Sequence, residues 1–312
     1  MRSGPRIAVI IPCYNEAAAI GKVVRDFRAA LPDAQVVVYD NNSRDGTSDI
    51  ARAAGADVYA EPLQGKGHVI RRMFADVDAD VYVLVDGDDT YDASAAPAML
   101  EKLVSERLDL VNGRRQETDV QNYRRGHRIG NRMLTGMAKR LFGDRLDDML
   151  SGYKIFSRRY VKSFPALSTG FEIETELTIH ALEMNMPIAE VDTAYRNRPE
   201  GSVSKLNTFR DGFRIVGMIA RLLKEVRPLA FFSTIAALFA SSAVFLTVPL
   251  ATEYLETGLV PRLPTAVLVT GMMIVAFLSL TCGVLLDSVA RSRREIKRLH
   301  YLSIPLAARS ST

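Results

Sequence analysis

The chain has little of three side chains that often define a functional class. Its 312 residues include two cysteines, four histidines and no tryptophan. Cys13 lies near the first predicted strand and Cys282 in an apolar segment, which excludes a disulfide framework and indicates a reducing compartment. No metal-binding spacing links the histidines, which are expected to be structural or surface groups: His68, His127, His180 and His300.

A strong charge imbalance is also missing, because the net charge is only +4. That excess is too small to indicate a nucleic-acid partner. The composition hides a division: residues 1–228 have the mixture of a soluble domain, whereas residues 229–286 are mostly apolar. Residues 1–10 do not resemble a secretory signal, since their short apolar run continues into a predicted strand.

Short apolar runs alternate with helical patterns through the first half of the chain. Strands are predicted at 6–11, 35–39, 57–60, 81–85 and 108–112, and helices at 16–30, 48–54, 67–77 and 95–106. Further helices are expected at 128–142 and 172–184, and strands at 155–156 and 188–195. This order predicts an α/β domain, with a mostly parallel, Rossmann-like sheet covered by helices on both faces. Ligands of such sheets bind beyond the carboxyl ends of the strands.

Two later segments are long and uncharged. Residues 229–250 and 265–286 each hold 22 residues without a charged side chain, enough to cross a hydrocarbon core of about 30 Å. Residues 206–228 have helical apolar spacing and several arginines, which favours an interfacial helix over a surface helix packed on its own domain. Basic residues on both outer flanks place the domain 1–205 and the tail 287–312 in the cytoplasm and the loop 251–264 outside.

Polar motifs follow the first two strands. In the first motif, Pro12, Tyr14, Asn15 and Glu16 offer an aromatic ring for a base and polar groups for its edge; an ordinary strand-to-helix turn remains the alternative. After the second strand, Asp40 can accept hydrogen bonds from a base or ribose. The rest of that motif favours a capped loop, with Asp45 as the capping side chain.

The third motif is acidic. Asp86, Gly87, Asp88 and Asp89 follow the strand at 81–85, where neighbouring carboxylates repel one another unless a cation is present. Mg²⁺ and similar hard cations bind one or two carboxylates together with substrate phosphates. We therefore predict a divalent metal at Asp86 and Asp88; the alternative is a solvated acidic turn.

Basic residues make up a fourth group, suited to phosphate oxygens, although each could equally be a solvated surface charge: Lys66, Arg114, Arg115, Arg128, Arg198 and Lys205. A fifth motif, residues 148–154, contains Ser151 and has no role that its spacing defines. Three alternating acids, Glu172, Glu174 and Glu176, are expected on a solvated helix face.

Together the motifs IPCYNE, DNNSRDGT, GKG, DGDD, DMLSGYK and RPEGSVSKL resemble the inverting family 2 glycosyltransferases of the GT-A fold. Over about residues 6–210 they are most similar to the polyprenyl-phosphate hexosyltransferases of the dolichol-phosphate-mannose-synthase type. The two apolar segments are similar to those of bacterial polyprenyl-phosphate glucosyltransferases. Two departures are Asn41, where an acid is usual, and one extra residue before Lys205.

The resemblance implies a role for each matched residue. Donor binding falls to Pro12, Tyr14, Asn15, Glu16, Asp40, Asn41, Lys66, Asp86 and Gly87, and the metal, Mg²⁺ or Mn²⁺, to Asp86 and Asp88. Asp88, Arg198 and Lys205 are the catalytic group, since Arg198 would contact the donor diphosphate and Lys205 would lie near it. The acceptor phosphate is assigned to Arg115, Arg128 and Ser151.

These roles imply transfer of a hexose from a nucleotide sugar, UDP-glucose by preference, to a polyprenyl phosphate at the cytoplasmic face of the inner membrane. GDP-mannose and UDP-N-acetylhexosamine are less favoured donors, and related two-span enzymes suggest a tetramer. A processive polysaccharide synthase is disfavoured, because its Gln-x-x-Arg-Trp motif is lacking. Two further hypotheses stay open, namely a transferase with a soluble or protein acceptor and a non-enzymatic nucleotide sensor.

Overall fold

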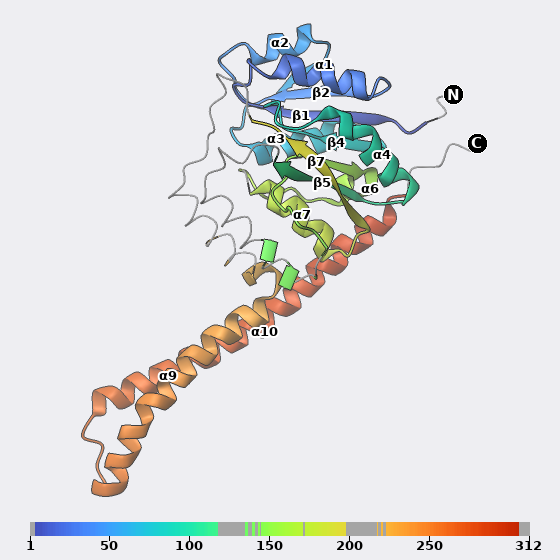
Figure 1. The fold of residues 1–312 in the computed structure, drawn as a ribbon. Helices are drawn as coiled ribbons and strands as arrows, with labels where there is room; N and C mark the ends of the chain where they lie inside the picture. Colours follow the sequence, from blue (N-terminus) through green and yellow to red (C-terminus); the bar gives the residue numbers. More distant parts are fainter. Residues whose placement is uncertain are drawn as a thin grey trace. The chain divides into compact units, whose positions relative to one another are not determined.

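A computed structural model describes residues 4–117, 135–136, 139–140, 143, 145–170, 172–197, 217, 220 and 223–305. The chain divides into two compact units (Figure 1). The first comprises Met1–Ile215 together with Lys297–Thr312, and the second comprises Val216–Ile296. The sequence boundary at residue 205 therefore lies close to the first division, whereas the return of the last segment to the first unit was not predicted.

The first unit is built on a seven-stranded sheet of order β3-β2-β1-β4-β6-β5-β7. The strands are β1 (Ile7–Cys13), β2 (Gln35–Asp40), β3 (Asp57–Ala60), β4 (Val81–Leu84), β5 (Leu110–Glu117), β6 (Lys154–Ser157) and β7 (Ile188–Tyr195). Only β6 runs against its neighbours, pairing antiparallel with both β4 and β5. The prediction of a mostly parallel sheet is confirmed.

Helices cover both faces of this sheet. They are α1 (Ile20–Ala30), α2 (Thr47–Ala53), α3 (Lys66–Asp76), α4 (Ala96–Ser105), α6 (Arg158–Ser163) and α7 (Ile173–Glu183), with a short 3₁₀ helix at Ala93–Ala95. The predicted helix at 128–142 lies almost wholly outside the described residues.

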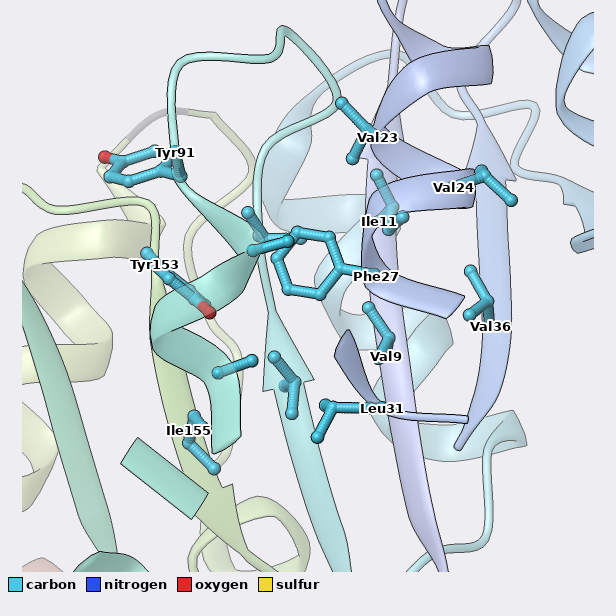
Figure 2. Close-up of a cluster of buried hydrophobic side chains, with 14 of the residues drawn as sticks. Val9, Ile11, Val23, Val24, Phe27, Leu31, Val36, Tyr91, Tyr153 and Ile155 are labelled. Carbon is cyan, nitrogen blue, oxygen red and sulfur yellow. The ribbon is translucent and has the colours of Figure 1, made fainter. Parts of the chain in front are cut away.

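Each face of the sheet carries its own apolar core. Val9 and Ile11 of β1 pack with α1, α2 and α4, whereas the intervening Ala8 and Ile10 pack with α3, α6 and α7. Successive side chains of a strand point to opposite faces, so a strand buried on both sides is a continuous apolar run. Figure 2 shows the first core, in which Phe27 of α1 points between β1 and Tyr153.

The second unit contains the long helix α9 (Pro228–Thr257) and most of α10 (Leu263–Ser303). Their most apolar windows are only 6% and 11% buried, and both helices are long and apolar enough to cross a membrane. Gly283 of α10 lies close to α9, where an added Cβ would come 3.0 Å from Phe232.

The ends of these helices correct the sequence interpretation. The predicted loop at 251–264 is largely helical, and the break is confined to residues 258–262. Glu253 and Glu256 end the uncharged run but do not end the helix, which stops at Gly258 with φ +69°. Residues 287–303 of the predicted tail likewise continue α10. Most of the predicted interfacial helix at 206–228 lies outside the described residues.

The end of α10 belongs to the first unit and makes polar contacts there. Tyr301 donates a 2.6 Å hydrogen bond to Asp109, and Lys297 pairs with Glu183 at 3.1 Å. Asp109 is fully buried and also accepts two bonds from Arg159, whose guanidinium lies 4.9 Å from the centre of the Tyr301 ring. Lys297 is one of the basic residues that flank the second apolar segment, and it forms an ion pair within the sheet-bearing unit.

Candidate active site

The carboxyl ends of three strands bring the predicted motifs to one edge of the sheet. Cys13 of β1 lies opposite Asp40 of β2, and Ile10 lies opposite Leu84 of β4. The loops that begin after Cys13, Asp40 and Leu84 therefore start side by side, as expected for parallel strands. This placement agrees with the sequence prediction of a ligand site at that edge.

The first two of these loops are joined by hydrogen bonds. Asn15 accepts a bond from the backbone N–H of Arg44 and donates its own N–H to the Ser43 hydroxyl. Thr47 accepts from the N–H of Glu16, and Asp45 accepts from the N–H groups of Ala17 and Thr47. Such bonds fix the loops without a ligand.

Other residues at the ends of β1 and β2 have the side chains predicted to contact a nucleotide. Tyr14 is 37% exposed, as stacking on a base requires. The Asp40 carboxylate is nearly buried and accepts bonds from the Ser48 hydroxyl and the Ser43 N–H. Pro12 is the penultimate residue of β1 and is partly exposed.

Asn41 has a structural role beside the one expected. Its buried amide donates 2.8 Å bonds to the carbonyls of Glu61 and Leu63 and accepts bonds from the N–H of Gly65 and the Gln64 side chain. Both N–H groups and the oxygen are thus occupied by the loop that leads to Lys66. The side chain therefore positions that loop, and its part in donor binding stays a prediction.

The acidic motif is partnered by a lysine. The Lys66 ammonium lies 2.5 Å from Asp86 and 2.5 Å from Glu174, in a bridge where the lysine side chain is only 9% exposed. Burial alone would lower the pKa of Lys66, but the two carboxylates outweigh it and raise that pKa above its usual value. Burial raises the pKa of Glu174, opposed by Lys66.

Glycines permit this close packing. A Cβ on Gly152 would lie 2.2 Å from Asp86, and one on Gly87 would lie 2.6 Å from the Cys13 sulfur. Asp88 is buried and accepts a 2.6 Å bond from the Thr90 hydroxyl. Burial raises the pKa of the Cys13 thiol, and the carboxylates around it add to this effect: Glu16, Asp40, Asp86 and Asp88. Four carboxylates therefore lie near Cys13 at this edge.

A divalent metal fits this edge only together with a ligand. Among the described residues, no group of three or more side chains is arranged to hold a metal ion. Asp86 and Asp88 are hard oxygen donors of the kind that bind Mg²⁺ with substrate phosphates. The metal site at Asp86 and Asp88 stays a prediction; in the structure Lys66 supplies a cation to Asp86 from within the chain.

The predicted acceptor residues that the structure describes are engaged with the protein itself. The Ser151 hydroxyl is fully buried and donates a 2.6 Å bond to the Gly113 carbonyl. Arg115 makes two bonds to Asp148, at 2.7 and 2.8 Å. Burial would raise the pKa of Asp148, but Arg115 outweighs it and lowers that pKa. Both residues hold the loop before β6 against β5.

Three other predicted site residues lie outside the described residues: Arg128, Arg198 and Lys205.

Two groups that are withdrawn from solvent, one partly and one fully, were not expected from the sequence. Glu174 was predicted in solvent with its neighbours, yet only Glu172 is exposed. Lys154 is fully buried and donates to Asn112 at 2.6 Å, and burial lowers its pKa to about 8. The feature of the sequence that could have indicated a buried Lys154 is its position at the start of an apolar strand.

Comparisons with known proteins agree with this architecture. The family model described as glycosyl transferase family 2 matches residues 8–164. Glycosyltransferase AglJ of Haloferax volcanii is 31% identical over 298 residues, which cover 95% of this chain and 98% of the relative. A dolichyl-phosphate hexose transferase of the same organism is 31% identical over 222 residues, 71% of this chain and 95% of that protein.

Among solved structures, the chain is similar to glucosyl-3-phosphoglycerate synthase from Mycobacterium tuberculosis in complex with Mn²⁺, UDP-glucose and phosphoglyceric acid. The TM-score is 0.56 at 26% identity, over 72% of this chain and 80% of the other. The expected GT-A fold, with two apolar C-terminal helices added, is confirmed. With a family model and a full-length relative in agreement, the chain belongs to glycosyl transferase family 2 and is a glycosyltransferase.

Proposed function

We propose that this glycosyltransferase moves a hexose from a nucleotide sugar, UDP-glucose by preference, to a polyprenyl phosphate with inversion. The observation that carries the proposal is the presence, in one chain, of the acidic edge around Asp86 and two helices whose apolar windows are 6% and 11% buried. Such helices suit an acceptor that resides in a membrane. The similarity to a dolichyl-phosphate hexose transferase and to a structure holding UDP-glucose supports both halves.

On this proposal, the donor lies at the carboxyl edge of the sheet. Tyr14 stacks on the base and Asp40 accepts a hydrogen bond from the base or ribose. Asp86 and Asp88 hold Mg²⁺ or Mn²⁺, which when bound supplies positive charge for the diphosphate. In the structure without a metal, Lys66 pairs with Asp86.

The acceptor needs little activation. A phosphate monoester has a second pKa of about 6, so it is largely dianionic at neutral pH. One of its oxygens forms the new bond to the anomeric carbon while the bond to the nucleoside diphosphate breaks and that group leaves with the electron pair. By resemblance, Arg128 aligns the acceptor phosphate, while Arg198 and Lys205 stabilise the leaving diphosphate.

The proposed location follows from the charges beside the two spans. Lys224 and Arg227 precede α9, and Arg291, Arg293 and Arg294 follow the apolar part of α10. An excess of basic residues marks the cytoplasmic side of a span. We therefore place the sheet-bearing unit, and both chain termini, on the cytoplasmic face of the inner membrane.

Purified full-length protein in detergent tests the proposal. It is supplied with undecaprenyl phosphate and, in separate reactions, radiolabelled UDP-glucose, GDP-mannose or UDP-N-acetylglucosamine, and the lipid product is analysed. We expect a metal-dependent glycolipid of inverted configuration, and its near-complete loss in Asp88→Ala. A second arm offers 3-phosphoglycerate, because a similar solved structure contains phosphoglyceric acid. Transfer to that compound but not to the lipid would refute the lipid acceptor.

A further inference from the structure

The bridge formed by Asp86, Lys66 and Glu174 has one more carboxylate than cation. The ammonium contacts both acids at 2.5 Å, and the lysine and Glu174 side chains are only 9% and 14% exposed. Asp86 is more open, with 26% of its side chain exposed. Two acids sharing one buried cation leave a net negative charge, and the accessible part of that charge is at Asp86.

The backbone on either side of Lys66 is held in place. Gly65 donates to Asn41, and Gly67 donates to the Thr169 carbonyl at 3.1 Å. A Cβ on either glycine would lie about 2 Å from a backbone oxygen of the segment 168–169, at 2.2 and 2.1 Å respectively. The lysine can therefore change partners only by moving its own side chain.

Glu174 is likewise fixed. It lies in the first turn of α7, and Glu176 of the same turn accepts bonds from the N–H groups of Leu167 and Ser168. The start of α7 and the segment beside Gly67 are thus tied together. These bonds keep the backbone that carries Glu174 close to the backbone that carries Lys66.

We propose that Lys66 and Glu174 allow one cation to replace another on Asp86 at the donor site, an event called the exchange below. Lys66 neutralises Asp86 while the site is empty, and it withdraws onto Glu174 when Asp86 engages a divalent cation. Like charges repel at this distance, so an ammonium and a divalent ion cannot both stay on the Asp86 carboxylate. Glu174 is then a positioning residue, because it keeps the displaced ammonium paired. This inference rests on the metal role of Asp86 in the proposed function.

The exchange predicts that two substitutions change the affinity for Mn²⁺ in opposite directions. We measure Mn²⁺ binding by electron paramagnetic resonance on the full-length protein in detergent, with UDP present to supply the diphosphate ligand. Lys66→Met removes the competitor and should bind Mn²⁺ about tenfold more tightly. Glu174→Gln leaves the displaced lysine without a carboxylate and should weaken binding about tenfold. Glu172→Gln is the matched control, since it removes an exposed acid from the same helix start and should bind as the wild type does.

The double variant Lys66→Met/Glu174→Gln separates exchange from simple charge, because it has the same net charge as the wild type. We expect it to bind Mn²⁺ several-fold more tightly than the wild type, since nothing competes for Asp86. Equal affinity would show that only net charge matters and would overturn the exchange, as would a wild type that does not bind Mn²⁺. The double variant leaves no unpaired buried charge, so it carries the test even if Lys66→Met does not fold.

Lipid transfer by the same preparations keeps this inference distinct from the proposed function. Glycolipid formation together with unchanged Mn²⁺ affinities in all variants would overturn the exchange alone. The predicted affinity pattern without any glycolipid would support the exchange and overturn the lipid acceptor.

Discussion

Replacing Asn41 by aspartate tests whether this residue positions the Lys66 loop. The substitution changes one buried NH₂ group to oxygen and removes both bonds to the carbonyls of Glu61 and Leu63. Each lost bond costs about 0.5–1.5 kcal/mol, and a buried carbonyl left without a donor costs about 1–3 kcal/mol. We expect the loop to open about 2–4 kcal/mol more easily, since the bond from Gly65 to the remaining oxygen survives.

Hydrogen–deuterium exchange of residues 61–67 measures this opening directly. A cost of 2–4 kcal/mol corresponds to exchange about 30- to 700-fold faster. Because Lys66 follows this loop, the KM for the donor should rise more than kcat falls. Asn42→Asp is the matched control: its amide also contacts this loop, but it is exposed, so its effect should stay below about 0.5 kcal/mol.

The pH dependence gives a second readout of the same variant. An aspartate at position 41, buried and facing two carbonyls, should have a folded-state pKa above its unfolded value. A raised pKa means that stability is present at low pH and is lost as pH rises through the folded pKa. Exchange in the variant should therefore approach that of the wild type on acidification. A variant that exchanges within twofold of the wild type at pH 8 would refute the positioning role.

Three further substitutions test other parts of the site and its support. Gly87→Ala would place a methyl group 2.6 Å from the Cys13 sulfur and should reduce transfer at least tenfold, with partial recovery when Cys13→Ala is added. Tyr301→Phe removes one hydrogen bond from the buried Asp109 carboxylate and should lower thermal stability by about 1.5–3 kcal/mol, whereas an unchanged melting temperature would show that the end of α10 does not support the sheet-bearing unit. The pKa of Lys154 is lowered to about 8, so the folded protein binds fewer protons than the unfolded chain between pH 8 and 10.5, and stability should rise across that window by up to about 3 kcal/mol relative to Lys154→Met.

Local patterns predicted the strands well because the sheet is buried on both faces. β7 begins and ends at the predicted residues, 188 and 195, and β1 and β2 differ by only one or two residues at their ends. The direction of β6 was beyond such reasoning. A short apolar run has the same pattern in either orientation, so the pattern does not show which way the strand enters the sheet.

The same distinction explains why the site was only partly predicted. Position along the chain placed Asp40 and Asp86 correctly, because the ends of parallel strands must meet. Pairing between charges depends instead on contacts between distant segments, and Lys66 and Glu174 are 108 residues apart. One signal was nevertheless present: a lysine between two glycines is consistent with a close backbone approach on both sides, which the structure shows at Gly65 and Gly67. The alternating acids Glu172, Glu174 and Glu176 gave no such signal, since only the position of the Lys66 loop determines which of them contacts the lysine.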